Sequence, residues 1–204
     1  MTDKPETIYV WFDTEYTNLD LEEAALMQVA ALITDSRLKR LLPPEQDIRL
    51  TLRLPESGRI SPWVKENLPD LVKACMGHET IDIVEADARL AAYVRTALAT
   101  RTAGHREYQL ILAGNSVQMD WRLAQRFLPN FLSHLHYRLL DVTAFKLEWN
   151  RREHKRSFTK ENPADIAKFF PDARLSEAGA RHDAYYDIQA SIAELAFYRL
   201  YMFR

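Results

Sequence analysis

The sequence predicts a single α/β domain over residues 1–204, in which a mixed five-stranded sheet is flanked by helices on both faces. Three observations lead to this prediction. Short apolar runs bounded by turn residues are typical of strands, longer stretches carry apolar residues at helical spacing, and a strand-rich first third is followed by alternating strands and helices. With 204 residues, 47% of them hydrophobic and 27% charged, the chain can bury one sizeable core.

Five apolar segments have the length and the flanking residues expected of strands. We expect these strands over residues 8–13, 26–34, 48–54, 109–113 and 137–141. In the third segment, aliphatic residues alternate with polar ones from Ile48 to Leu54, which predicts one solvent-facing side. The dipeptide Pro43-Pro44 and the stretch 55–58 indicate turns on either side of it.

Helices are predicted between and after these strands. Ser61 followed by Pro62 fits an N-cap and a first-turn proline, so a short helix should begin there. Further helices are expected over about 80–100, 121–128, from 143 onward, and over about 183–202. The segment 150–181 contains a charge run and two prolines, and we expect an irregular loop with short helices.

Charge and cysteine content limit the partners and the compartment. The formal net charge of −2 argues against a broad basic surface for long nucleic acid, so short substrates fit better. Cys75 is the only cysteine, and we expect it to be a small buried thiol in a reducing cytoplasm. The first residues lack the regions of a signal peptide, and no apolar run approaches the roughly 20 residues that span a bilayer, so no membrane partner is expected.

Four carboxylates occupy positions from which they could reach one place. Asp13 and Glu15 follow an apolar strand and, being two residues apart, share one face. Asp120 follows another apolar strand and a turn, at the start of a helix, and Asp187 lies on the last helix. Carboxylates this close would repel one another without cations, and their hard oxygen ligands favour Mg²⁺ or Mn²⁺. Two such ions are suited to phosphoryl transfer.

His182 is the candidate general base, because an unperturbed imidazole titrates near neutrality. In one continuous helix, five residues would place His182 and Asp187 about 140° apart, so we expect His182 to precede the helix. None of these patterns is specific alone. Acid-x-acid pairs also occur at 20/22, 45/47 and 85/87, and solvent-exposed carboxylates are the ordinary alternative.

The chain resembles a known family at five stretches. Residues 13–19, 114–120 and 182–187 are similar to the three motifs of the DEDDh exonucleases, which have the ribonuclease-H-like fold. Residues 136–143 and 191–199 are similar to the oligoribonucleases within that family. The resemblance implies a homodimer that uses two divalent cations, Mg²⁺ or Mn²⁺. It also implies 3′-to-5′ hydrolysis of short RNA, down to dinucleotides, to 5′-mononucleotides.

The resemblance also implies roles for individual residues. The metal ligands would be Asp13, Glu15, Asp120 and Asp187, with His182 as the general base. Leu19 would wedge against the bases, and Ser116, His136 and Arg138 would cap the 5′ phosphate, with Tyr137 contributed across the dimer. Trp63 corresponds to an aromatic residue of the family and is either a stacking surface or a core anchor.

Several residues depart from the family pattern. Tyr16 and Asn18 stand where Met and Gly are usual, and Leu68 replaces an expected histidine. The segment 150–181 is longer than in the family and matches it only at 158–160; its run 151–156 is either a basic substrate loop or a solvated helix end. Two alternatives therefore stay open: a DEDDh exonuclease acting on longer RNA or single-stranded DNA, and a catalytically silent nucleotide-binding protein.

Overall fold

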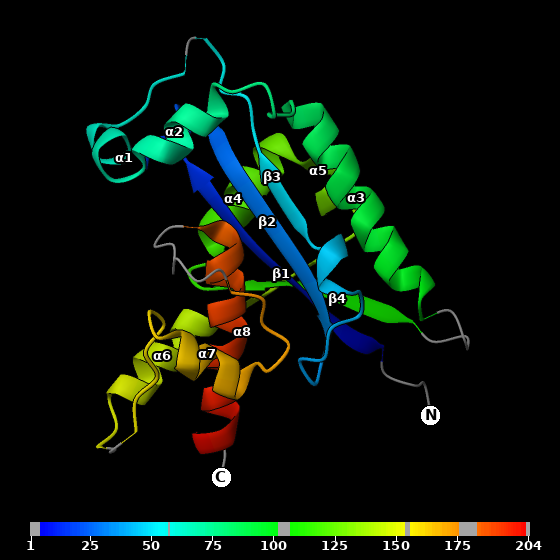
Figure 1. Ribbon diagram of the computed structural model, residues 1–204. Helices are drawn as coiled ribbons and strands as arrows, with labels where there is room; N and C mark the ends of the chain where they lie inside the picture. Colours follow the sequence, from blue (N-terminus) through cyan, green and yellow to red (C-terminus); the bar gives the residue numbers. More distant parts are fainter. Residues whose placement is uncertain (1–4, 57, 102–106, 154–155, 176–182, 203–204) are drawn as a thin grey trace.

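The strand β1 (Glu6–Tyr16) is the middle strand of a five-stranded sheet in the computed structural model (Figure 1). The structure describes residues 5–56, 58–101, 107–153, 156–175 and 183–202. The sheet order is β3-β2-β1-β4-β5, with β2 (Leu26–Asp35), β3 (Ile48–Thr51), β4 (Tyr108–Gly114) and β5 (His136–Asp141). The first three strands pair antiparallel, whereas β4 and β5 run parallel to β1, so the predicted mixed sheet is confirmed.

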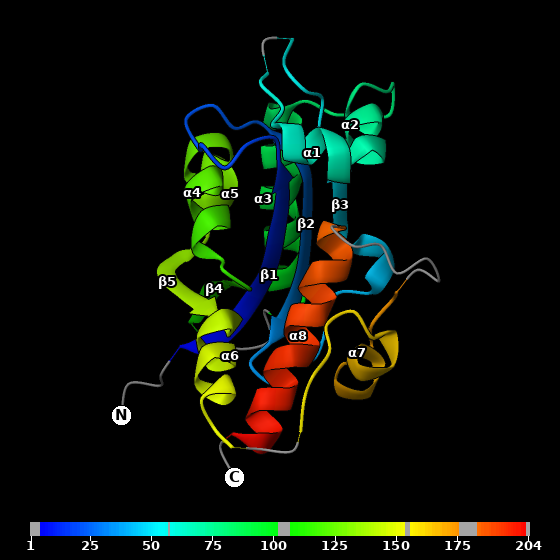
Figure 2. The same ribbon diagram turned by 90° about the vertical axis from the view of Figure 1, so that its left-hand side faces the viewer.

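Helices cover both faces of the sheet, as Figure 2 shows. One face carries α3 (Ile83–Ala99), α4 (Gln118–Phe127) and α5 (Pro129–Leu132). The opposite face carries α6 (Val142–Asn150), α7 (Pro163–Phe169) and α8 (Ala184–Tyr201). Two short helices, α1 (Pro62–Asn67) and α2 (Pro69–Cys75), lie beyond the ends of β1 and β2 (Figure 1). No helix in the described ranges is long and apolar enough to cross a membrane.

The alternation of side chains along β1 sorts them between the two faces. Val10 and Phe12 join the core under α3 to α5, whereas Trp11 joins the core under α8. Continuing this alternation, Asp13 and Glu15 project to the side of α8, and Thr14 projects to the side of α4. The alternation along β1 therefore assigns each of these side chains to one face of the sheet.

Two strand ends create the place where the acidic residues lie. β1 pairs with β4 only as far as Trp11 with Ala113, because β4 ends at Gly114. Beyond that point β1 continues to Tyr16 with β2 as its partner. A Cβ at Gly114 would lie 3.0 Å from the carbonyl oxygen of Phe12, so a larger residue here would force β1 and β4 apart by a few tenths of an ångström.

Some element boundaries differ from the sequence expectation. β1 does not end at Asp13 but runs three residues further, and β3 ends at Thr51 instead of 54. α4 begins three residues before the expected 121, and α2 and α5 were not predicted. Each of these two short helices begins with a proline, and tertiary packing rather than a long apolar stripe specifies it. α7 is one of the short helices expected within the segment 150–181.

Candidate active site

Three carboxylates from the two ends of the chain converge beside α8. Asp13 and Glu15 come from β1, and Asp187 comes from the first turn of α8. That helix begins where the side chain of Asp183 accepts a hydrogen bond from the backbone N–H of Tyr186 at 2.9 Å. One oxygen of each of Asp13, Glu15 and Asp187 lies within 4.8 Å of the others. This spacing is suited to oxygen ligands of a hard divalent cation.

Asp120 approaches the same region from the other face of the sheet. It lies in the first turn of α4, is 5% exposed, and its Oδ1 accepts a 2.6 Å hydrogen bond from the hydroxyl of Thr14. Asp120 is not in the three-residue group defined above. Its charge nevertheless acts on that group, since Asp120 is the largest of the charged neighbours that raise the pKa of Asp13. The fourth predicted ligand is thus adjacent to the cluster.

Burial and mutual repulsion raise the proton affinity of these acids. Burial is the main reason that the pKa of Asp13 lies well above its ordinary value, followed by the charges of Asp120 and Asp187. Burial, and then the charge of Asp187, raises the pKa of Glu15 to about 8. Burial likewise raises the pKa of Asp120 to about 7, against the lowering effect of its hydrogen bond from Thr14. Such a cluster is stabilised by cations, which its oxygen-only donor set fits.

A lysine already contacts the cluster. The Nζ atom of Lys160 lies 2.7 Å from Oδ1 of Asp187, and its positive charge lowers the pKa of Asp13 and Glu15. Sequence reasoning did not place Lys160 in the site. The sequence signal was the family match at 158–160. Lys160 lies 27 residues before Asp187 in the sequence, and only the folded chain shows that the two side chains are in contact.

His182 lies outside the described residues. The described residues resume at Asp183, the N-cap of α8, so the placement of His182 before this helix stays a prediction. Its orientation and its role as a base stay predictions.

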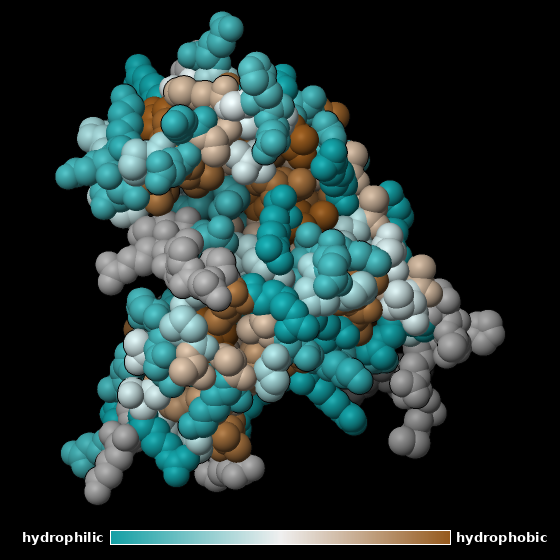
Figure 3. Space-filling view, viewed as in Figure 1, coloured by the Kyte–Doolittle hydropathy of each residue, from teal (hydrophilic) through white to brown (hydrophobic). Residues whose placement is uncertain are grey.

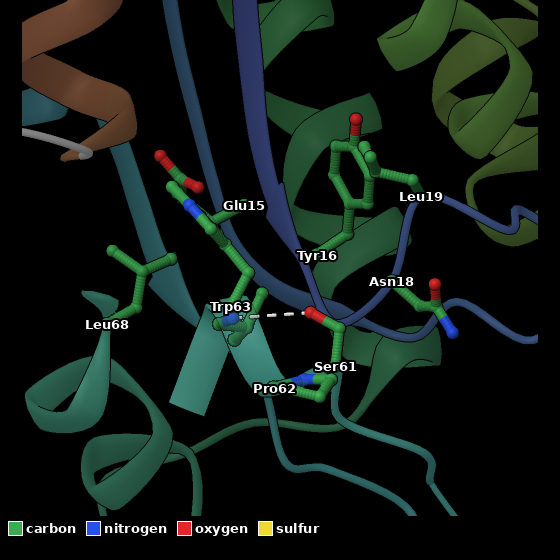
Figure 4. A pocket seen from close by; sticks show the side chains of 9 residues that line it. Glu15, Tyr16, Asn18, Leu19, Ser61, Pro62, Trp63 and Leu68 are labelled. Atoms are coloured by element: carbon green, nitrogen blue, oxygen red, sulfur yellow. Dashed lines mark hydrogen bonds between the residues drawn. The ribbon is translucent and has the colours of Figure 1, made fainter. Parts of the chain in front are cut away.

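A pocket of about 620 Å³ opens next to Glu15. Figure 4 shows Tyr16 and Leu19 on one side of it and Trp63, from α1, on the other. Leu19 is 79% exposed and Trp63 is 52% exposed, so Trp63 is not a core anchor. In Figure 3, hydrophobic side chains show around α1 and α2 and between α2 and α3, and further ones show over the region of α7 and α8. Exposed apolar surface of this kind beside a charged cluster is typical of a ligand site.

Three departures from the family pattern, Tyr16, Asn18 and Leu68, also line this pocket. Tyr16 therefore brings a phenol ring and its hydroxyl group to the wall of the pocket. The pocket is adjacent to the carboxylates because Glu15 and Tyr16 are consecutive residues of β1.

The residues predicted to cap a 5′ phosphate are spread along β5 and the loop beside its last residue. Ser116 has a φ of 53°, and its N–H donates to Oδ1 of Asp141 at 3.0 Å, at the last residue of β5. His136 is the first residue of β5, and its Nδ1 accepts from the N–H of Arg138 at 3.1 Å. β5 bulges between His136 and Leu139, so its two ends face Ile111 and Gly114 of β4, which are three residues or roughly 10 Å apart. Tyr137, between His136 and Arg138, is 72% exposed.

Solved structures share this fold. Exonuclease I from Methylocaldum szegediense aligns with a TM-score of 0.61 and 14% identity, over 97% of this chain and 41% of that one. E. coli exonuclease I bound to an oligonucleotide aligns with a TM-score of 0.57 and 14% identity, over 96% of this chain and 40% of that one. The chain thus spans less than half of these structures, and the likeness shows the ribonuclease-H-like fold.

Sequence comparison gives the family. The sequence model described as exonuclease matches residues 10–195, so fold and sequence define an exonuclease. The human mitochondrial oligoribonuclease is 33% identical over 199 residues, covering 96% of this chain and 73% of that protein. The Nocardia farcinica oligoribonuclease is 33% identical over 98% of this chain and 81% of its own length. The Francisella tularensis oligoribonuclease is 26% identical over 93% of this chain and 93% of its own length. The chain belongs to the exonuclease family and, within it, to the oligoribonucleases.

Proposed function

We propose that this protein is a 3′-to-5′ exoribonuclease that hydrolyses short oligoribonucleotides, down to dinucleotides, to 5′-mononucleotides. The observation that carries the proposal is the convergence of Asp13, Glu15 and Asp187 within 4.8 Å beside an apolar pocket. The family membership of the chain supports the same reaction. We expect the ligands to be Asp13, Glu15, Asp187 and Asp120, with Mg²⁺ or Mn²⁺ as the cations.

Each part of the site has a task in this reaction. Two bound cations would stabilise the attacking and leaving oxygens of the phosphodiester. The chain itself must then hold the 3′-terminal nucleotide with its phosphate at the carboxylates and remove a proton from the attacking water. His182, just before α8, is the group proposed to take that proton.

The pocket is proposed to hold the terminal nucleobase. Leu19 and Trp63 face each other across it, and both are exposed, so a flat ring can contact apolar surface on two sides (Figure 4). The purine or pyrimidine would lie beside Tyr16, whose hydroxyl can hydrogen-bond to a base edge. Since Glu15 lines the same pocket, a bound base places its phosphate near the carboxylates.

We also propose a homodimer that completes the phosphate cap. A 5′ phosphate would be held by Ser116, His136 and Arg138 in charge-assisted bonds, with Tyr137 contributed by the partner. Ser116 contacts the last residue of β5 whereas His136 is its first, and a second copy would add further groups to a substrate held along this strand. The exposed ring of Tyr137 on this strand is available for such a contact. A cap of this kind would favour the shortest substrates. We also propose that the enzyme is cytoplasmic.

One experiment separates this proposal from its alternatives. Single 5′-phosphorylated RNA and DNA strands of two to about ten nucleotides are presented with Mn²⁺, and kcat/KM is measured for each. We expect RNA dinucleotides to be among the best substrates. Poor dinucleotide turnover with good turnover of longer RNA or of DNA would support the broader exonuclease instead. The catalytically silent alternative would be supported if the protein binds substrate but shows no cleavage activity that Asp13→Asn or Asp187→Asn removes.

A further inference from the structure

Lys160 reaches the carboxylate cluster from a fixed backbone. The hydroxyl of Tyr186, on α8, donates a 3.0 Å hydrogen bond to the carbonyl oxygen of Lys160. One residue earlier, the N–H of Thr159 donates to the side chain of Asp165 on α7 at 3.0 Å. The lysine side chain is 28% exposed and that of Asp187 is 16% exposed, so their 2.7 Å ion pair is largely shielded from water. The Lys160 side chain is therefore held within the site by its backbone and its ion pair.

The contact atom of Lys160 is one that a metal ion would need. Asp187 contributes to the group of oxygens within 4.8 Å that could hold a cation. Its Oδ1 already accepts the ammonium of Lys160. The ammonium also attracts Asp13 and Glu194, the latter seven residues after Asp187 and so on the same face of α8. One cation thus neutralises part of a cluster that would otherwise consist of carboxylates alone.

We propose that Lys160 is a positioning residue of the metal centre: its ammonium holds Asp187 in place when no metal is bound and competes with the metal ion for that carboxylate. This inference rests on the metal centre of the proposed function. The competition lowers the affinity of the site for metal. The ion pair itself keeps the acidic residues arranged before the ions bind. When the ion takes Asp187, the ammonium still has Glu194 as a neighbouring anion.

The charges decide the direction of the expected effect. Removing the ammonium removes a competitor for Asp187 and a repulsion that acts on the incoming ion. The net effect is tighter metal binding.

A purely structural role for Lys160 makes a different prediction. If its ion pair only anchored the segment before α7, neutralising it would lower the free energy of unfolding and leave metal affinity unchanged or weaker. Lys146 provides a control, because its Nζ lies 3.7 Å from Oε1 of Glu194, which is on α8 like Asp187. Lys146→Met therefore removes a longer ion pair with a more exposed lysine from α8, at a carboxylate that is not one of the three in the cluster.

The test is a calorimetric titration of substrate-free protein with Mn²⁺. We expect Lys160→Met and Lys160→Gln to bind Mn²⁺ about tenfold more tightly than the unaltered protein. Lys160→Arg keeps the positive charge and should stay near the unaltered affinity, as should Lys146→Met. Unchanged or weaker binding by both neutral variants would overturn the inference. If the unaltered protein and Asp187→Asn both bind no Mn²⁺, the metal centre itself is wrong, which is a separate outcome. Two neutral variants of different shape guard against a folding defect in one of them.

Discussion

The hydroxyl of Thr14 donates a 2.6 Å hydrogen bond to Oδ1 of Asp120. Thr14 is the residue between Asp13 and Glu15 on β1, and it projects to the opposite face of the sheet. A single strand segment thus presents two acids to α8 and orients a third acid on α4. Both Thr14 and Asp120 are 5% exposed, so this bond forms where an unpaired carboxylate would be costly.

Thr14→Val should therefore impair catalysis at neutral pH. The Thr14 hydrogen bond lowers the pKa of Asp120, which burial raises to about 7, so losing the bond raises that pKa further. We expect kcat/KM to fall about tenfold near pH 7 and to recover as pH rises. The measurement is a pH–rate profile. Thr14→Ser keeps the hydroxyl and should retain the original profile; a Val variant with an unshifted profile would contradict the role of the bond.

Stability without metal should fall as pH rises. Glu15 and Asp120 have folded-state pKa values of about 8 and about 7, above the ordinary 4.5 and 3.8. Groups with raised pKa values contribute stability that is full below about pH 4 and is lost through about pH 7 to 8. We expect a loss of roughly 1–3 kcal/mol in EDTA over this range. Denaturant unfolding at several pH values measures it.

The difference that Mn²⁺ makes isolates the site from other titrating groups. The stabilisation by Mn²⁺ should grow with pH, because ionised carboxylates bind the ion. Glu15→Gln should reduce the pH dependence in EDTA, whereas Glu45→Gln, at an exposed position, should not. Equal Mn²⁺ stabilisation at low and high pH would argue against a carboxylate site.

The pocket residues should matter for substrate binding. Leu19→Ala removes a side chain that is 79% exposed, so the free energy of unfolding should change by less than about 0.5 kcal/mol. Trp63→Ala removes a half-buried ring and should cost roughly 1–3 kcal/mol. Base stacking contributes about 1–3 kcal/mol, and we expect KM for a dinucleotide to rise about tenfold. Val84→Ala, at a 74% exposed position on α3, is the matched control and should leave KM unchanged. Steady-state kinetics and denaturant unfolding together test this.

Arg138→Ala should abolish discrimination by the 5′ phosphate. A charge-assisted bond to phosphate contributes about 1.5–3 kcal/mol, so the preference for a 5′-phosphorylated over an unphosphorylated dinucleotide should drop at least about tenfold. Competition between the two substrates measures the ratio. Arg122→Ala changes another exposed arginine, on α4, and should keep the preference. If Arg138→Ala keeps it as well, the cap lies elsewhere.

A buried ion pair outside the site should dominate stability. Asp47 pairs with Arg40, and their side chains are 1% and 7% exposed. The hydroxyls of Tyr185 and Tyr93 donate to Asp47 at 2.7 and 3.0 Å, which ties α8 and α3 to the β2–β3 connection. Breaking a buried pair leaves a charge without its partner, so Asp47→Asn should cost about 3–5 kcal/mol. Urea unfolding tests this against the exposed neighbour Glu45→Gln, for which we expect almost no change.

The strand pattern alone determined much of this molecule. Apolar runs predicted five strands and the mixed sheet, and the period of two placed Asp13 and Glu15 on one face. The position of Asp120 at a helix start followed from the strand and turn before it. Boundaries such as the end of β1 were missed because Asp13 to Tyr16 extend beyond β4 and keep only β2 as a partner, a long-range pairing that local sequence does not encode.

Only the tertiary structure distinguished acids of similar pattern. Asp13 and Glu15 share an acid-x-acid spacing with Glu45 and Asp47, yet Asp47 forms a buried structural ion pair. Lys160 and Asp187 are 27 residues apart in sequence and meet at 2.7 Å. The physical reason is that a carboxylate's role depends on which charges and how much water surround it. Those surroundings are assembled from distant segments when the sheet and α8 pack together.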